Sequence, residues 1–251
     1  MKLAKALLLP VLLVVLAEIG GRAAGTSDSI APPSAIALAF GQAIADGSML
    51  AATRDTLISA FGGLLVGAGL GLLAGIAVGS VRTLDRLLEL PFEVLRPIPS
   101  VAVIPIALIA LGFGYRLEIV IVAYACFWPL LILTRAAVAG VEPRLMEVSR
   151  ALRFGVVQRT LKIVAPAALP RVFVAFRLAA GIALVVAVTV EIAVNPQGLG
   201  YQVMTAGQAL RPDLTLAYVV WIGVVGYALN VALVAAQHRL FGQAGRIEAR
   251  P

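Results

Sequence analysis

Charged side chains beside or within an apolar segment are the first residues of this chain that could do chemistry. Glu191 and Arg177 both fall in the apolar run Val172–Ala193. An ionisable side chain inside a membrane is costly to bury, so it is a functional candidate by default. Glu191 could carry a proton or coordinate an ion, but its place near the outer end of the run favours a solvated role. Arg177 lies near the inner end and can extend its guanidinium toward the cytoplasm.

A second candidate is the basic segment of residues 141–177, which separates two strongly apolar runs. Six cations precede the next apolar run: Arg144, Arg150, Arg153, Arg159, Lys162 and Arg171. Apolar residues alternate with them at roughly helical spacing. Pro143 predicts the start of one helix, Phe154-Gly155 the turn after it, and residues 156–164 a second helix that Pro166 and Pro170 close. Helices with one apolar and one basic face predict a surface that docks on a partner.

Several kinds of chemistry are excluded. None of the lysines (Lys2, Lys5 and Lys162) follows a glycine, so there is no phosphate-binding G-x-x-x-x-G-K-[ST] loop and no ATP hydrolysis of that kind. The lone histidine, His238, rules out a metal motif with two histidines. No G-x-S-x-G elbow occurs, which leaves a membrane hydrolase without support. We expect a non-catalytic chain that binds no cofactor or metal of its own.

Membrane-spanning helices must position these candidates. Of 251 residues, 61% are hydrophobic and 13% are charged, which is about half the charged fraction of a soluble domain. A span needs roughly 20 apolar residues. The pattern predicts a single all-α membrane domain over residues 1–251 with about six spans: Ala6–Ile19, Thr56–Val81, Pro97–Tyr115, Ile119–Val141, Val172–Ala193 and Leu214–His238.

The distribution of cations predicts the orientation of these spans. Sixteen arginines and lysines lie at one set of span ends, and four lie at the other: Arg22, Arg54, Arg116 and Arg211. Cytoplasmic loops carry the excess of cations, so both termini are expected in the cytoplasm. This bias also explains the net charge of +7 without a nucleic-acid partner. Alternatively, the first segment is a cleaved signal peptide, which would leave five spans and oppose the charge bias.

Glycine forms the most regular pattern of the chain, within the second predicted span. It recurs at every fourth position: Gly63, Gly67, Gly71, Gly75 and Gly79. Small residues at this spacing let two helix backbones approach closely in a membrane. We expect a tightly packed internal helix, with a dimer seam or a substrate-lining face as alternatives.

Proline marks the third predicted span. A short helix over Leu84–Leu95 should end before Pro97-Ile98-Pro99, where the span begins. Pro105 then falls inside the span and should kink it, because it frees a backbone carbonyl. Kinked spans are common along translocation paths and also in lipid-facing helices, so Pro105 is a candidate for either position.

Together these motifs resemble a known family. The run Glu147–Ala151 followed by Pro166–Pro170 resembles the "EAA" loop of ABC-importer permeases. Ala17-Glu18, Leu95–Ser100 and Glu191 with Gly198–Gly200 look like the nitrate, sulfonate and taurine branch of binding-protein-dependent permeases. The resemblance extends over nearly the whole chain, and the order and spacing of the motifs make it specific.

The resemblance implies a type I importer permease of the bacterial inner membrane. Such a subunit dimerises, docks on cytoplasmic ATPase subunits that bind ATP and Mg²⁺, and receives a small solute from an extracytoplasmic binding protein. The solutes of this branch include nitrate, sulfonates, taurine and bicarbonate. With no fused domain in the chain, a homodimer is the simplest assembly. The resemblance places the coupling loop at about residues 141–171. The residues placed by position at the ATPase contact, the coupling helix, are Glu147, Ser149, Arg150, Ala151, Leu152, Arg153, Phe154, Gly155 and Pro166.

The sequence departs from the family pattern in the turn of this loop. The family usually has glycine six residues after the motif glutamate, where this chain has Arg153. Ser149 also stands where alanine is usual. Either Gly155 takes the turn, shifted by two residues, or the coupling is altered. The alternative to an ATP-driven importer is an ion-gradient-driven carrier or channel that uses Glu191, and a membrane scaffold without transport is a third reading.

Overall fold

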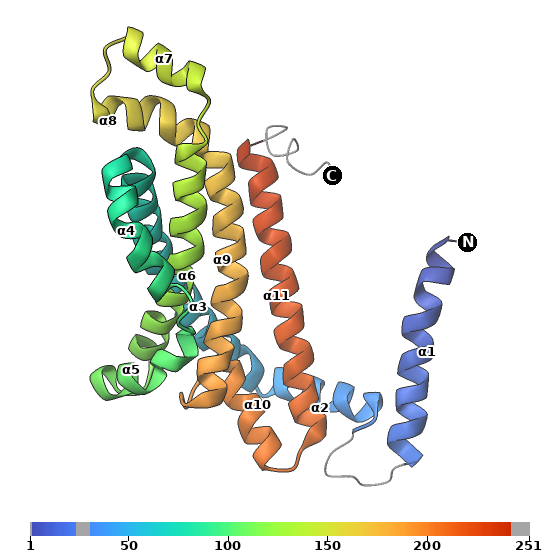
Figure 1. Ribbon diagram of the computed structural model, residues 1–251. Helices are drawn as coiled ribbons and strands as arrows, with labels where there is room; N and C mark the ends of the chain where they lie inside the picture. The colour runs from blue at the N-terminus through green and yellow to red at the C-terminus, as the bar shows by residue number, and fades with distance from the viewer. Residues whose placement is uncertain (1, 24–30, 242–251) are drawn as a thin grey trace.

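The computed structural model describes residues 2–23 and 31–241, and every regular element in these ranges is a helix (Figure 1). This agrees with the all-α class expected from the sequence. In chain order the elements are α1 (Lys2–Ala23), α2 (Pro33–Ala45), α3 (Ser48–Ser80), α4 (Arg82–Leu95), the 3₁₀ turn η1 (Ser100–Val103), α5 (Ile104–Leu111), α6 (Tyr115–Ala139), α7 (Pro143–Ala151), α8 (Val156–Arg159), the π-helical stretch η2 (Thr160–Val164), α9 (Ala165–Ala193), α10 (Gly198–Gln208) and α11 (Pro212–Phe241).

Fewer helices qualify as membrane spans than the sequence predicted. Four helices of the described ranges are long and apolar enough to cross a membrane: α3, α6, α9 and α11. Helix α9 is the main part of a longer continuous helix, Val157–Ala193, which also includes η2 and most of α8. A fifth is counted if α4 and the segment Ser100–Leu111, which meet at an 80° bend, form one span. Helix α1 contains the expected first span but is not among them, so the count of six is not reached.

Helix α1 stands apart from the other spans and is tied to the molecule through α2 (Figure 1). The Glu18 carboxylate accepts hydrogen bonds from the backbone N–H and the hydroxyl of Ser34, at 2.9 and 2.7 Å. Arg22 pairs with the same carboxylate at 2.6 Å. Helix α2 lies across the bundle at this end and packs against α11.

Helices α3 and α6 pack against each other along an exceptionally close contact, which the regularly spaced glycines line. A Cβ added at Gly67 would lie within 3.0 Å of the Cα, C and O atoms of Ala123. One added at Gly75 would lie 2.8 Å from the Leu131 carbonyl oxygen. Real Cβ atoms do not come this near, so the contact requires glycine. A Cβ at Gly69, on another face of α3, would meet nothing within 4 Å.

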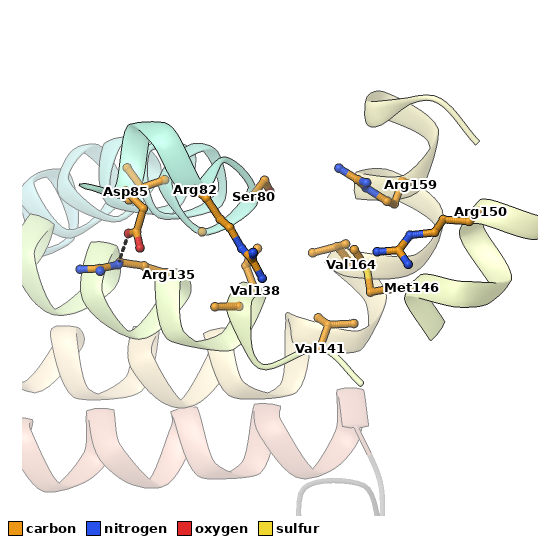
Figure 2. Close-up of a pocket in the computed structure, with 13 residues that line it drawn as sticks. Ser80, Arg82, Asp85, Arg135, Val138, Val141, Met146, Arg150, Arg159 and Val164 are labelled. Carbon is orange, nitrogen blue, oxygen red and sulfur yellow. Dashed lines mark ion pairs between the residues drawn. The ribbon is translucent and has the colours of Figure 1, made fainter. Parts of the chain in front are cut away.

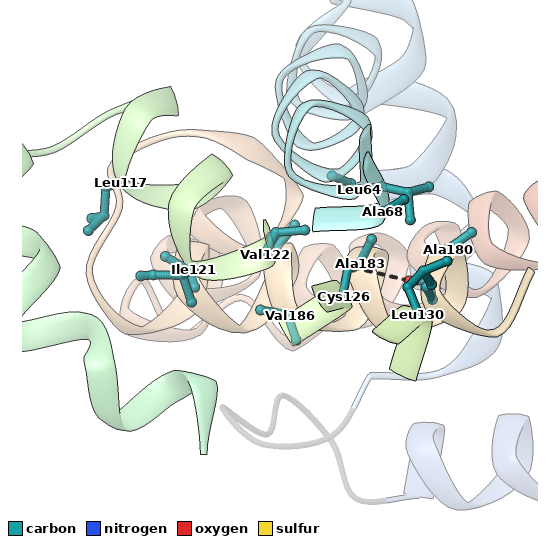
Figure 3. Close-up of a cluster of buried hydrophobic side chains, with 14 of the residues drawn as sticks. Leu64, Ala68, Leu117, Ile121, Val122, Cys126, Leu130, Ala180, Ala183 and Val186 are labelled. Atoms are coloured by element: carbon teal, nitrogen blue, oxygen red, sulfur yellow. Dashed lines mark hydrogen bonds between the residues drawn. The ribbon is translucent and has the colours of Figure 1, made fainter. Parts of the chain in front are cut away.

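The hydrophobic core lies where α3, α6 and α9 meet (Figure 3). Helix α9 contributes small residues, among them Ala179, Ala180 and Ala183, and α6 contributes larger ones such as Ile121. The Cys126 thiol is fully buried and donates a hydrogen bond to the Ala179 carbonyl oxygen at 3.4 Å. Alanines on one helix facing branched side chains on the next allow close packing in the absence of water.

The third expected span is not a single kinked helix, and the role expected of Pro105 in bending it is wrong. Pro105 lies in the first turn of α5, where its missing N–H needs no helical partner, so it starts a helix. Helix α5 ends after eight residues, before Gly112 and Gly114 with φ values of 71° and 111°. The sharp bend lies earlier, at Pro97-Ile98-Pro99, where α4 ends as expected.

The prolines after the basic segment do not close its second helix, in contrast to the expectation. Helix continues from Val157 to Ala193 through Pro166 and Pro170. The turn just before Pro166 is π-helical, and the Ala165 N–H donates to the Thr160 carbonyl five residues earlier. A wider π turn accommodates the proline ring and its missing donor without breaking the helix.

Candidate functional site

The basic segment folds into a helical hairpin of α7 and α8, which we call the coupling loop (residues 141–164). It projects from one end of the bundle, between α6 and α9 (Figure 1). Pro143 occupies the first turn of α7, as the sequence predicted. The loop is therefore joined directly to two helices of the core.

The turn after α7 is made by Arg153, not by Gly155. Arg153 has φ = 52°, whereas Gly155 is not among the residues with positive φ. The Phe154 N–H donates to the Ser149 carbonyl at 3.0 Å, and the Arg153 N–H donates to the Arg150 carbonyl at 2.9 Å. This pair of bonds is a Schellman motif with arginine at its left-handed position. The turn thus stays at the family's glycine position, and the alternative of a shift by two residues is wrong.

Replacing Arg153 by glycine is expected to stabilise this turn by about 1 kcal/mol, because a left-handed residue with a Cβ costs roughly 1–2 kcal/mol. Hydrogen exchange at the amides of Arg153 and Phe154 should slow by about fivefold. Gly155→Ala is the control, since a Cβ there would meet nothing within 4 Å. Slower exchange in neither variant, together with loss of the turn in Gly155→Ala, would assign the left-handed position to residue 155.

The apolar residues of the coupling loop point in two directions. Met146 and Val164 pack inward against the ends of the spans. Outward-facing residues stay largely exposed: Val148 50%, Leu152 58%, Val157 70% and Leu161 65%. Of the coupling residues expected from the sequence, Ser149 is buried and its hydroxyl donates to the Met146 carbonyl at 2.7 Å. Phe154 is half-buried under the Lys162 ammonium, which lies 5.2 Å from the ring centroid.

The remaining expected coupling residues are all exposed: Glu147, Arg150, Ala151, Leu152, Arg153, Gly155 and Pro166. All but Pro166 lie in the hairpin, whereas Pro166 lies at the start of α9. An exposed surface with apolar and charged residues side by side is suited to binding another protein.

A second site is a fully buried polar cluster near the other end of α3, α6 and α9. Its members are Thr56, Ser59, Glu118, Glu191 and Asn195, each with 0% exposure. The Asn195 side-chain N–H donates to the Glu118 carboxylate, and its carbonyl oxygen accepts from the Gly114 N–H at 2.7 Å. These bonds tie the start of α6 to the turn that follows α9. Neither Oε2 of Glu118 nor Oε1 of Glu191 has a hydrogen-bond donor within the described parts of the chain.

The Glu191 carboxylate lies against the N-terminus of α10. It accepts a hydrogen bond from the Gly200 N–H at 2.8 Å, and the neighbouring Leu199 N–H donates to the Thr56 hydroxyl at 2.8 Å. A helix N-terminus offers free N–H groups and a favourable dipole to a negative side chain. Gly198 has φ = 84° and lies directly over the carboxylate. A Cβ at this position would overlap Oε1 and Cδ of Glu191 and would lie 2.7 Å from Oε2.

This geometry corrects the solvated role expected for Glu191. The sequence places Glu191 near the end of an apolar run, but α10 folds back over that end and covers the side chain. Arg177 is half-buried and donates to the Gln237 side chain of α11 at 3.3 Å. The two residues are about 21 Å apart along α9 at 1.5 Å per residue. Pro105 is exposed on α5, so the structure does not bring these three residues into one site.

Sequence reasoning missed most of the polar cluster. Glu118 stands at the border of an apolar run and Asn195 in a glycine-rich stretch, where charged and polar residues are ordinary, so neither stands out in the sequence. The four-residue spacing of the glycines on α3 was a signal for the cluster. Continued toward the N-terminus from Gly63, this spacing gives Ser59 and then Asp55, so a polar face follows the glycine face on the same side of the helix. Asp55 accepts a hydrogen bond from the Tyr115 hydroxyl at 2.8 Å, beside the cluster.

Known proteins with similar sequences and a similar fold are transport proteins. The chain is 33% identical over 223 residues to a Bacillus subtilis protein named as a putative aliphatic sulfonates transport permease protein. The match covers 88% of this chain and 81% of that protein. It is 28% identical over 173 residues to the taurine transport system permease protein of Escherichia coli, covering 69% and 63%. A chain in the inward-facing structure of the MetNI methionine ABC transporter has a similar fold, with a TM-score of 0.67 at 20% identity, over 74% of this chain and 93% of that one.

A family model adds the matched region. The model described as the binding-protein-dependent transport system inner membrane component matches residues 67–244, which include the α3–α6 contact from Gly67 onward, the coupling loop and the polar cluster except its α3 residues. This confirms the resemblance noted in the sequence. The chain belongs to the family of binding-protein-dependent transport system inner membrane components, and it is a permease subunit of an ABC importer.

Proposed function

We propose that this permease moves a small anion into the cytoplasm, driven by separate ATPase subunits that dock on the coupling loop. The observation that carries the proposal is the projecting loop itself (Figure 1), on which apolar side chains remain exposed beside a concentration of arginines. An apolar surface of this kind on a helical hairpin marks an interaction site. ATP and Mg²⁺ would bind to the partner, since this chain has no phosphate-binding loop.

The structure supports a mechanical route from the loop to the far side of the molecule. The helix Val157–Ala193 is continuous from the loop to beyond Glu191, and about 51 Å of helix separates Val157 from Glu191 at 1.5 Å per residue. On its other side the loop joins α6, which packs on α9. A displacement of the loop by the ATPase would therefore move α6 and α9 together, as rigid bodies do in alternating access. The polar cluster would move with them as a unit.

The substrate class is proposed from the relatives. Two of them are named for sulfonate and taurine transport, and both names refer to small sulfonate compounds. Other relatives are named for the transport of bicarbonate and nitrate, which are smaller oxyanions and belong to the same proposal. A separate extracytoplasmic protein would deliver the solute, and a homodimer of this chain would enclose the path.

The orientation is proposed from charge and shape together. The N-terminal end of α1 and the C-terminal end of α11 both point toward the end that carries the coupling loop (Figure 1). Cations are concentrated at that end, which favours the cytoplasm. We propose that α1 and the bent α4–α5 segment complete six crossings of the bacterial inner membrane, with both termini inside. Their support is the apolar composition of both segments.

Reversing the charge of Glu147 should abolish ATP-driven uptake. Glu147 is exposed on α7 between cations of the loop, so its carboxylate is available to a cation of the ATPase, and lysine would repel that cation. We expect uptake of a sulfonate into native membrane vesicles to fall more than about tenfold. Glu93→Lys, an exposed reversal on α4, should transport normally.

The same vesicles separate the two driving forces. Uptake should require ATP and persist with a protonophore present. Uptake that needs no ATP, survives in Glu147→Lys and is lost with the protonophore would replace this proposal with a gradient-driven carrier.

A further inference from the structure

A cavity of about 540 Å³ lies between the coupling loop and the ends of the spans (Figure 2). One wall is formed by the end of α3, the start of α4 and the end of α6. The opposite wall is formed by α7, α8 and η2. The cavity therefore separates the moving loop from the membrane-embedded helices.

The charged residues that line the cavity are mostly arginines. Arg82 and Arg135 belong to the span wall, and Arg150 and Arg159 belong to the loop wall. Among the described lining residues Asp85 is the one carboxylate, and Arg135 pairs with it at 2.5 Å. These four cations and one anion carry a net charge of +3.

Three guanidinium groups of the lining have no counter-ion among the residues that the structure describes. Arg82, Arg150 and Arg159 make no ion pair with a described residue of the chain. Figure 2 shows their side chains reaching into the space from both walls. Arg82 and Arg150 are exposed and Arg159 is half-buried, so water screens their mutual repulsion, but three like charges around one cavity still favour an anion bound between them.

Guanidinium groups recognise carboxylates and phosphates particularly well, because their planar pairs of N–H donors match the oxygens of both. A carboxylate has two oxygens, whereas a phosphate has more and can accept from three arginines at once. Below the arginines the lining is apolar, with Val138, Val141, Met146 and Val164. A phosphate group attached to an apolar or neutral body would satisfy both parts of the lining.

We propose that this cavity binds a phosphate-type oxyanion, held by Arg82, Arg150 and Arg159. The ligand would bridge α4 to the coupling loop, which otherwise contacts the span ends through the small apolar cluster around Met146. A bound phosphate would therefore hold the loop against the spans. This inference concerns the chain alone and stands or falls separately from the proposed substrate and ATPase.

Two sources carry this chemistry, the headgroup of an anionic phospholipid and free phosphate. The purified full-length chain is placed in phosphatidylcholine nanodiscs, and its thermal unfolding is followed while phosphatidylglycerol is added to the lipid or inorganic phosphate to the buffer. The test variant is Arg82→Gln/Arg150→Gln. The matched control is Arg86→Gln/Arg144→Gln, which removes two exposed arginines of the same helices that do not line the cavity.

We expect one of the two additions to raise the unfolding temperature of the parent chain and of the control. In the cavity variant the apparent affinity should fall by about 100-fold, since each lost charge-assisted contact is worth about tenfold. A response to phosphatidylglycerol alone identifies a lipid headgroup, and a response to phosphate identifies a free anion. No response to either addition, or equal losses in both double variants, would overturn the proposal.

Discussion

Gly67→Ala is expected to destabilise the folded chain by about 3 kcal/mol, whereas Gly69→Ala should change its stability by less than about 1 kcal/mol. The added methyl at residue 67 would lie within 3.0 Å of three backbone atoms of Ala123, and a backbone cannot rotate out of the way as a side chain can. Helices α3 and α6 would have to separate, and the core that they share with α9 would open. At residue 69 the methyl meets nothing within 4 Å.

The two variants make a matched pair because they place the same change on one helix, two positions apart. Their stabilities can be compared by unfolding the purified chain with sodium dodecyl sulfate in mixed micelles. Gly67→Leu should fail to fold, since overpacking of that size exceeds what a core absorbs. Equal stability of Gly67→Ala and Gly69→Ala would contradict the close α3–α6 contact.

Gly198→Ala is expected to cost about 3 kcal/mol through a different mechanism. The residue has φ = 84°, which alone costs an alanine roughly 1–2 kcal/mol. Its Cβ would also overlap the buried Glu191 carboxylate and push it away from the Gly200 N–H. Gly207→Ala is the control on the same helix, because its Cβ would lie 4.0 Å from the nearest atom. Unfolding in mixed micelles reads out both variants.

A double variant separates the two contributions to this loss. In Gly198→Ala/Glu191→Ala the overlapping carboxylate is gone, so only the backbone strain should remain from the glycine change. The Gly198→Ala substitution should therefore cost about 1–2 kcal/mol less in the Glu191→Ala background than in the parent. Strictly additive effects would show that Gly198 does not hold Glu191 in place.

Features set by local sequence could be predicted. The α3 stripe depends only on glycine spacing. The end of α4 precedes Pro97 and Pro99, and the start of α7 coincides with Pro143, as expected because proline lacks the N–H of a helix interior and is tolerated in a first turn. The amphipathic character of the coupling loop could also be predicted from the sequence, since its cations and apolar residues alternate at helical spacing. These patterns, together with the family motifs, were sufficient to identify the permease and to predict a docking loop.

Features that depend on what packs against a residue could not be predicted. Local rules predict that Pro105 and Pro166 interrupt helices. In the structure, however, Pro105 lies in the first turn of a helix, and Pro166 follows a π turn within a continuous helix. Arg153 adopts a left-handed conformation because the two hydrogen bonds of the Schellman motif fix the turn there. Glu191 is buried because α10, which follows it in the chain, folds back over it. In each case a neighbouring segment decides the outcome.

We expect an ATPase to dock on the exposed apolar face of the coupling loop. The most direct measurement is to purify the tagged chain from its native membrane in mild detergent and to quantify the proteins that accompany it. We predict an ATPase subunit in equal amount, retained by Leu210→Asp and lost from Leu152→Asp. Both leucines are exposed, at 61% and 58%, but Leu210 lies in the turn between α10 and α11, away from the loop. A chain that purifies without an ATPase while sulfonate uptake continues, or an ATPase that stays bound to Leu152→Asp, would contradict this account.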